Sequence, residues 1–400
     1  MDPNIKDLLD LILRWMHLIA GIMWVGNSML FNWLDRNLVP KEGIDGEIWM
    51  VHSGGFYQVE KKQLAPSQMP KTLHWFYWQS GITWMTGFSL LGVVYYMGAG
   101  GAYLLDPSVS NWTAREATML GVGVIVGAWI FYDLLWKSPL GKIKDGVFAV
   151  AISFLALGAI AYGLTHIMAG RAAYIHVGAM MGTLMAGNVF MQILPSQRKL
   201  VAATIAGKAQ DKAVADAAKQ RSIHNNYMTF PVLFIMLSNH YPSTYGSELK
   251  WIILGVLIFS GAGIRHFMNI RYSTSKWAAG FATTATVGVA TLFLLISHQP
   301  TAKAKAANFG PDQISFTAVN IVIAQRCRPC HSATPTDATL TAAPAGVMFD
   351  TPEQIKKHAE RIKARAVISK TMPLGNKTGI SQEERDLLGQ WFVEGASITK

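Results

Sequence analysis

The sequence predicts an all-α protein, in which a polytopic membrane bundle of about eight transmembrane helices precedes a small soluble helical domain. Three observations support this fold class. Of the 400 residues, 51% are hydrophobic and only 15% are charged, against roughly 25% charged in soluble domains. Eight apolar segments are long enough to span a membrane. Beyond them, residues 311–400 change to a polar, amphipathic composition.

The apolar segments define a membrane domain, which we place at residues 1–299. A spanning helix needs about 20 mostly apolar residues. The sixth segment is short, and it spans only if its helix begins inside the polar run before it. No cleavable signal peptide is evident, so we expect the first segment to act as its own insertion signal. The eight segments are residues 11–33, 74–98, 117–136, 146–166, 172–194, 227–240, 250–270 and 277–297.

Lysine and arginine residues are concentrated in alternate loops, those after the first, third and fifth segments. The positive-inside rule places these loops in the cytoplasm, so both termini are expected outside. The net charge of +11 does not indicate a nucleic-acid-binding protein. It lies in loops between apolar segments, and no basic stripe is interleaved with aromatic residues on one soluble face.

The C-terminal part of the chain has its own helix signals. Residues 300–310 form a predicted linker, and residues 311–400 a small domain. A helix is expected at 312–325. Capping-box sequences at Thr351-Pro352-Glu353-Gln354 and Ser381-Gln382-Glu383-Glu384 predict two further helix starts.

Cys327-Arg328-Pro329-Cys330-His331 matches C-x-x-C-H, the attachment signature of a c-type haem. Cys327 and Cys330 can each form a thioether to one porphyrin, and His331 then ligates the iron. These are the only two cysteines in the chain. A structural zinc site would need further ligands. A chance motif would explain the same residues, and so would a thioredoxin-like pair, although the βαβ context of such a pair is missing.

A c-type haem also needs a second axial ligand. We prefer Met372, because the Pro and Gly that follow it hold it on a loop from which its thioether can reach the iron. Met348 is the rival, and its other interpretation is core packing. Together these features predict a class I cytochrome c-like domain, small enough that the covalent cofactor supplies part of its core.

Polar residues inside the membrane are expensive and are therefore functional candidates. The densest run is residues 224–231, at the inner mouth of the sixth segment. In it, Asn225 and Asn226 can recognise the edge of a planar heterocycle through paired donors and acceptors. Arg265 beside His266 can bind an anion. The alternative for such residues is an ordinary interhelical hydrogen bond.

Two further groups are candidates. In the loop after the first segment, Gly54-Gly55 would let the backbone approach a ligand. The aromatic rings of Phe56, Tyr57, Trp75 and Phe76 can stack on a flat ring. The alternative for these aromatics is the interfacial belt. His17 and His176, on the first and fifth segments, are candidate ligands of a second, non-covalent haem b.

Long strings of the sequence carry a family resemblance, and they follow one another along the whole chain: His17-Leu18-Ile19-Ala20-Gly21, Trp24-Val25-Gly26, Val51 to Tyr57, Met69-Pro70, Leu73-His74-Trp75-Phe76, Gly182 to Asn188, His224 to Pro231, Ser238 to Pro242, and the haem motif with Met372-Pro373. In these strings the chain resembles the bacterial membrane-bound urate oxidases (urate hydroxylases) that carry a C-terminal cytochrome c.

The resemblance implies that urate in the cytoplasm loses two electrons and gains a hydroxyl from water, giving 5-hydroxyisourate. Electrons would pass to haem c and then to another cytochrome or a terminal oxidase. Haem attachment implies that the C-terminal domain lies on the periplasmic side of a bacterial inner membrane, in agreement with the loop charges. We hypothesise that His52, His74 or His224 takes a proton from urate or water.

Two different functions stay open at this point. A non-catalytic cytochrome subunit would relay electrons from a partner dehydrogenase or from quinol, and urate alone would not reduce it. A transporter with a redox tail is suggested by a weak internal similarity, Gly26-Asn27 in the first segment against Gly187-Asn188 in the fifth.

Overall fold

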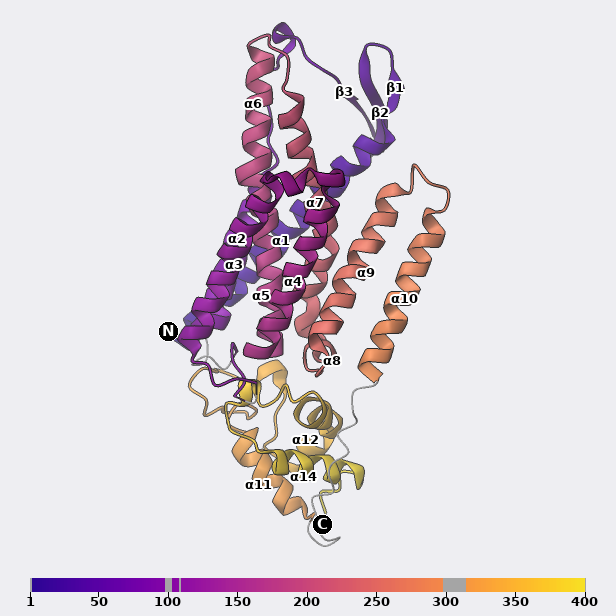
Figure 1. Ribbon diagram of the computed structural model, residues 1–400. Coiled ribbons are helices and arrows are strands. Elements are labelled where there is room, and N and C mark those ends of the chain that lie inside the picture. Colours follow the sequence, from indigo (N-terminus) through magenta and orange to yellow (C-terminus); the bar gives the residue numbers. More distant parts are fainter. Residues whose placement is uncertain (1, 98–102, 108, 298–313, 400) are drawn as a thin grey trace.

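Apolar runs of the sequence form long helices, because a helix satisfies its backbone amides and carbonyls without help from water. In the computed structural model these helices form an elongated bundle, with a small helical domain at one end (Figure 1). The structure describes residues 2–97, 103–107, 109–297 and 314–399. The predicted linker at 300–310 lies outside the described residues.

Nine α-helices of the described residues build the bundle, two of them extended by π-helical turns. They are α1 (Pro3–Asn37), α2 (Trp78–Leu90) with η2 (Leu91–Tyr96), α3 (Ala114–Lys137), α4 (Val147–Ile167), α5 (Gly170–Gly187) with η6 (Asn188–Ile193), α6 (Leu194–Ile205), α7 (Lys212–Leu237), α9 (Lys250–Ile270) and α10 (Trp277–Ser297). Shorter turns between them are η1 (Pro66–Gln68), η4 (Pro139–Gly141), η5 (Ile143–Gly146), η7 (Ser238–His240) and α8 (Pro242–Tyr245).

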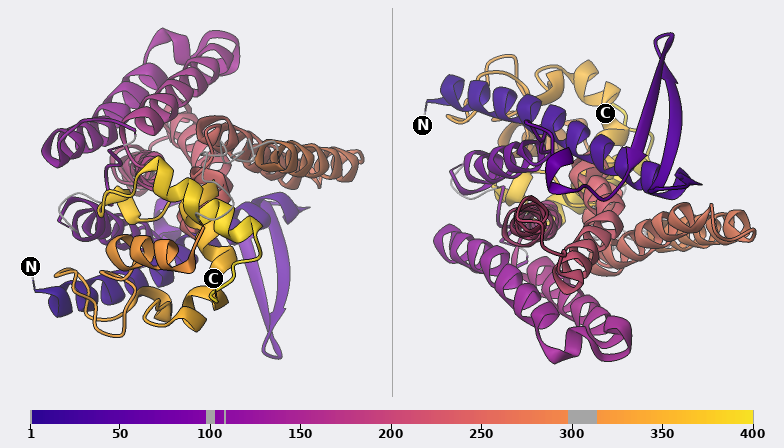
Figure 2. Two further views of the ribbon diagram at one scale, coloured as in Figure 1. Left: turned by 90° about the horizontal axis from the view of Figure 1, so that it is seen from below. Right: turned by 90° about the horizontal axis from the view of Figure 1, so that it is seen from above.

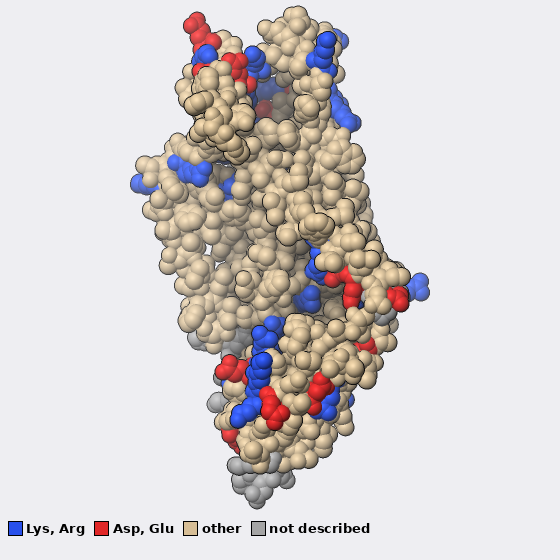
Figure 3. All heavy atoms as spheres, turned by 180° about the vertical axis from the view of Figure 1, so that it is seen from behind, with Lys and Arg blue, Asp and Glu red and all other residues tan. Residues whose placement is uncertain are grey.

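Within the described residues, six helices are long and apolar enough to cross a membrane. They run over Asn4–Asn37, Ala114–Lys137, Val147–Ile167, Gly170–Ile205, Lys250–Ile270 and Trp277–Ser297. Figure 3 shows a wide belt of uncharged surface between charged side chains at the two ends of the molecule. The chain is therefore a membrane-associated protein.

Two of the eight predicted spans differ from these six. The helix predicted from residue 74 begins only at Trp78, so His74 lies on the extended segment before α2. The sixth span lies in α7, which begins at Lys212, inside the polar run, and is 26 residues long. Its charged first half lowers its mean hydropathy. The count of eight stays a prediction.

Residues 39–61 form a three-stranded antiparallel sheet, so the all-α prediction is wrong for this segment. The strands are β1 (Val39–Lys41), β2 (Ile44–His52) and β3 (Gly55–Lys61). Ser53 and Gly54, with φ of +51° and +77°, join β2 to β3 in a two-residue turn. Positive φ at both positions is the geometry that two-residue hairpins require. The turn is sufficient to explain a glycine at position 54. The predicted role of Gly54-Gly55, which was to let the backbone approach a ligand, is not needed to explain it.

The bundle is organised around α5 and α7. Figure 2 shows the pairs α1–α2, α3–α4 and α9–α10 arranged around them. Tyr174, His176 and Val177 of α5 are fully buried in the main hydrophobic core. Glycines allow close helix contacts at two points: a Cβ at Gly187 would lie 2.6 Å from the Trp129 ring of α3, and a Cβ at Gly178 would lie 2.6 Å from Ile235 of α7.

The C-terminal domain has a separate hydrophobic core. Its elements are α11 (Phe316–Arg326), η8 (Pro344–Gly346), α12 (Pro352–Lys357), α13 (Ala359–Ile362), η9 (Lys363–Ile368), η10 (Leu374–Asn376) and α14 (Gln382–Val393). Both predicted capping boxes, at Thr351 and Ser381, are confirmed. The helix expected at 312–325 is α11, which starts later than expected because the Ser315 side chain caps its first turn.

This domain lies at the end of the bundle where α1 begins (Figure 1). Thr341 donates a hydrogen bond of 3.2 Å to Asp7 of α1. Gly246, just after α8, lies so close to Ser369 that a Cβ there would be 2.7 Å from the serine side chain. The N-terminal helix and the C-terminal domain therefore share one end, as the loop charges predict, while the side of the membrane stays a prediction.

Replacing Gly187 by alanine should destabilise the bundle, because the added methyl group overlaps the Trp129 ring of α3. Overpacking of this kind costs about 1–3 kcal/mol. We expect a lower melting temperature of the purified protein in detergent. Gly182→Ala is the matched control on the same helix, since nothing lies within 4 Å of a Cβ there. Equal melting temperatures for the two variants would contradict this close packing.

Candidate functional site

A cavity of about 660 Å³ lies in the half of the bundle opposite the C-terminal domain. Its walls are α1, the extended segment before α2 together with the start of α2, the α5–η6–α6 rod and α7. Its polar lining consists of Asn27, Ser28, Asn32, His74, Gln79, Gln197, Ser222, Asn225 and Thr229. Its aromatic lining consists of Trp24, Phe31, Trp75 and Phe76. Five amide side chains, flat aromatic rings and one imidazole therefore share one space.

Hydrogen bonds hold the buried amides of this wall in fixed orientations. The Asn225 Nδ2 donates to the Met185 carbonyl at 2.9 Å, and its Oδ1 accepts from the Asn188 Nδ2 at 2.8 Å. The same Asn188 Nδ2 lies 3.1 Å from the Tyr132 hydroxyl, which lies 2.6 Å from the His224 Nδ1. A chain of side chains thus runs from the cavity wall at Asn225 to His224 on the far face of α7.

Two buried acceptors at this wall have no partner among the described residues, the Gln79 Oε1 and the Asn188 Oδ1. Gln79 lines the cavity directly. A buried acceptor without a donor costs free energy, so a ligand bearing N–H groups would relieve the Gln79 oxygen. The cavity can therefore accept hydrogen bonds from a ligand as well as donate them.

Of the predicted catalytic histidines, the structure brings only His74 to the cavity. His224 lies on another face of α7, against Trp136 with ring centroids 4.1 Å apart, and reaches the cavity only through Tyr132 and Asn188. His52 stands at the end of β2, exposed, with its Nδ1 3.1 Å from the Ser53 hydroxyl.

Of the predicted substrate-binding residues, the structure brings only Asn225 to the cavity. Phe56 and Tyr57 lie on β3 and are 79% and 52% exposed. Asn226 and Arg265 face each other between α7 and α9, where the Asn226 Oδ1 accepts from the Arg265 Nε at 3.0 Å. His266 is exposed beside them, with its Nδ1 2.8 Å from the Tyr227 hydroxyl.

The predicted ligands of a haem b are each engaged with other elements. The His17 Nδ1 lies 2.9 Å from the Thr83 carbonyl of α2. His176 is fully buried, with its Nδ1 2.8 Å from the Ala172 carbonyl and its Nε2 2.9 Å from the Tyr96 hydroxyl. Both nitrogens of His176 have protein partners, so the arrangement does not fit an axial ligand, and we derive no step through a haem b.

The C-x-x-C-H motif follows directly on α11, whose end is extended by a tight turn. The His331 amide donates to the Cys327 carbonyl at 2.9 Å and closes this turn. The imidazole Nδ1 lies 2.9 Å from the Val347 carbonyl. A proton on that nitrogen leaves the Nε2 lone pair free, which is the usual orientation of a metal-ligating histidine. The residues therefore fit a haem c ligand.

The two thiols are free, and burial raises the pKa of Cys327 to about 12 and also raises that of Cys330. Reactive thioredoxin-like cysteines have a lowered pKa instead. Met372 is half-buried, and its backbone is held by the Arg365 carbonyl at 3.0 Å and by the Arg385 guanidinium at 2.7 Å. No group of three or more His, Cys, Asp or Glu side chains in the described ranges could hold a bare metal ion.

Sequence reasoning missed several residues of the cavity and its wall. Tyr132 and Gln79 carry no local signal, because each sits alone in an aromatic or apolar helix. Asn27, Asn32 and Asn188 were not missed, because the sequence already makes every amide inside an apolar segment a functional candidate. Only the packing shows that Asn27 and Asn32 face the same space as Asn225.

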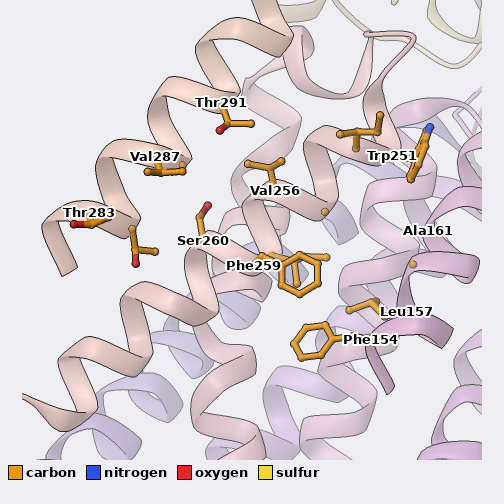
Figure 4. A pocket seen from close by; sticks show the side chains of 16 residues that line it. Phe154, Leu157, Ala161, Trp251, Val256, Phe259, Ser260, Thr283, Val287 and Thr291 are labelled. Carbon is orange, nitrogen blue, oxygen red and sulfur yellow. The ribbon is translucent and has the colours of Figure 1, made fainter. Parts of the chain in front are cut away.

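A second cavity of about 650 Å³ lies between α4, α9 and α10 (Figure 4). Phe154, Leu157, Phe259 and Trp251 form its walls, and its polar groups are mainly hydroxyls such as those of Ser260, Thr283 and Thr291. It has no amide, imidazole or charged side chain in its lining. Recognition of a polar heterocycle therefore belongs to the first cavity.

Comparison with known proteins places the chain in a family. No curated protein and no solved structure matches the chain. The family model described as urate oxidase N-terminal matches residues 3–297, which include every residue that lines the first cavity. Because this match covers well over half of the 400 residues, the chain belongs to the urate oxidase N-terminal family.

Proposed function

We propose that the chain is a membrane-bound enzyme that oxidises urate to 5-hydroxyisourate with water as the source of oxygen. The reaction is urate + H2O → 5-hydroxyisourate + 2 H⁺ + 2 e⁻, and it consumes no molecular oxygen. The observation that carries the proposal is the amide- and aromatic-lined cavity inside the part of the chain that matches the family.

The lining of the cavity suits a flat purine. The rim of urate alternates N–H donors with carbonyl acceptors, and an amide side chain offers one of each. Asn27, Asn32 and Asn225 stand on two walls, α1 and α7, while Gln79 offers an unpartnered acceptor from α2. Aromatic rings such as Trp75 can stack on the purine face and exclude water from it.

His74 is the chemical group of the cavity that can accept a proton. It lies on the extended segment before α2, so its imidazole is not fixed by a helix. In the proposed mechanism the neutral imidazole takes a proton from urate or from the attacking water as electrons leave the purine. His224 acts differently, by holding Tyr132 and, through Asn188, the Asn225 amide. The exposed positions of His52, Phe56 and Tyr57 do not support a role in this step.

The C-terminal domain is proposed to be a cytochrome c-like domain. Cys327 and Cys330 would hold haem c by thioethers, and His331 and Met372 would ligate its iron. When bound there, the haem supplies a one-electron acceptor for the oxidation. A downstream cytochrome c or terminal oxidase would complete the path to the respiratory chain. The shared end of the N-terminus and this domain supports the proposed placement of both in the periplasm of a bacterial inner membrane.

Urate alone should reduce the haem of the purified full-length protein under anaerobic conditions. The reduced absorbance bands should appear without any added dehydrogenase, and 5-hydroxyisourate should form at one molecule per two electrons. If urate leaves the spectrum unchanged while quinol reduces the haem, the protein is an electron conduit and the proposed enzyme activity is wrong. Urate accumulation in vesicles without product would instead indicate a transporter.

His74→Ala should lower kcat for urate-driven haem reduction by about 10²–10⁴-fold, the range expected for loss of a general base. KM should change little, because the amides and aromatic rings of the cavity remain. His166→Ala is the matched control, since His166 is exposed on α4 and does not line the cavity. A His74→Ala enzyme with full kcat would exclude this residue as the base.

Tyr132→Phe and His224→Ala should change KM rather than kcat, in contrast to His74→Ala. Both residues act on Asn225 from behind the cavity wall. We expect KM for urate to rise several-fold while kcat stays within a few-fold of the wild-type value. The two variants should behave alike, and the double variant should add little. A loss of kcat in His224→Ala as large as in His74→Ala would instead make His224 a proton acceptor.

A further inference from the structure

Three arginines gather where α1 and α9 end, at the end of the bundle opposite the C-terminal domain. They are Arg36 in the last turn of α1, Arg265 in α9 and Arg271 directly after α9. Within the part of the chain that the structure describes, no carboxylate forms an ion pair with any of the three. The acidic neighbour Asp35 is paired with Lys61 at 2.6 Å.

Two amides, Asn226 and Asn269, join Arg36 and Arg265, and Arg271 follows directly on the same helix, with its guanidinium donating to the Tyr272 hydroxyl. We call this group the arginine seam (Arg36, Asn226, Arg265, Asn269 and Arg271). The buried Asn226 Oδ1 accepts from the Arg265 Nε at 3.0 Å and from the Asn269 Nδ2 at 2.7 Å. The Arg36 guanidinium donates to the Asn269 carbonyl. Arg265 is only 6% exposed.

Two side-chain nitrogens of the seam are buried without a hydrogen-bond partner among the described residues, and both are donors. The Asn226 Nδ2 is buried without a hydrogen-bond partner in the described ranges, on a side chain that is 3% exposed. The Arg271 Nε is likewise buried without a hydrogen-bond partner in the described ranges. Unmade hydrogen bonds of buried donors are costly, and three nearby cations add repulsion. A ligand that relieves both the unmade hydrogen bonds and the repulsion between the arginines must be negatively charged and rich in acceptor oxygens.

We propose that the arginine seam binds a phosphate group. Guanidinium groups bind phosphate oxygens through paired hydrogen bonds. The seam lies at the ends of two membrane helices, the depth at which basic pockets between helices meet lipid headgroups. None of its residues lines the proposed urate cavity, so the inference goes beyond the proposed function and does not depend on it. The phosphate can belong to an anionic phospholipid or be free in solution.

Two probes distinguish these sources on the full-length protein. The melting temperature is measured in phosphatidylcholine nanodiscs with added inorganic phosphate, and in nanodiscs that contain phosphatidylglycerol. We expect at least one probe to raise the melting temperature of the wild type by several degrees. A response to phosphatidylglycerol alone would identify a lipid headgroup as the ligand. A response to inorganic phosphate at millimolar concentration would identify a soluble ligand. A wild type that responds to neither probe overturns the proposal.

Arg271→Gln should lose most of this response, whereas Arg198→Gln should keep it. Arg198 is exposed on α6 and carries the same charge at the same end of the bundle. Equal responses in the two variants would show that the stabilisation comes from general surface charge, and would overturn the proposed phosphate site.

Asn226→Asp gives a test in the opposite direction, because it supplies an anion from the chain itself beside Arg265. This variant should melt at a higher temperature than the wild type in phosphate-free phosphatidylcholine nanodiscs, and neither probe should stabilise it further. A variant that is destabilised yet still responds to phosphate would contradict the assignment of the seam.

Discussion

The structure depends on one constraint: polar side chains that a helix carries into an apolar bundle must find partners in the protein. Helix α7 meets this constraint on three faces. His224 pairs with Tyr132 of α3, Asn225 with Asn188 and the Met185 carbonyl, and Asn226 with Arg265 and Asn269 of α9. Each pairing fixes the position of a neighbouring helix. The same polar residues that make α7 a poor membrane segment therefore hold the bundle together.

The cavity lies where the α5 rod changes its winding, at the level of these partners. Gly187 ends the regular helix in close contact with Trp129, and the π-helical turn η6 begins at Asn188. A π-helical turn leaves one residue out of the regular hydrogen-bond ladder and redirects the side chains beyond it. Asn188 is thereby buried against Tyr132 and Asn225, while Val189 and Ile193 line the cavity. The same turn therefore contributes both to the packing of the bundle and to the shape of the cavity.

The cavity and the C-terminal domain lie in opposite halves of the molecule. Under the proposed function, electrons from a substrate in the cavity would have to pass through the bundle to reach the C-terminal domain. The packed aromatic core between them includes Tyr96, His176 and Tyr174, whose polar atoms are all hydrogen-bonded. This core ends at Tyr245 of α8, beside the contact of Gly246 with Ser369 of the C-terminal domain.

By itself the sequence determined most of the long apolar helices, both capping boxes and the C-x-x-C-H motif, since each of these patterns lies within one continuous segment of the chain. It also identified the polar run of α7, but it did not show which way each side chain points. Asn225 and Asn226 are adjacent, yet successive residues of a helix lie about 100° apart. Only the packing of α1 and α9 decided that Asn225 faces a cavity and Asn226 an arginine seam. The hairpin likewise carried Phe56 and Tyr57 away from the cavity, because strand pairing depends on residues that the local pattern does not reveal.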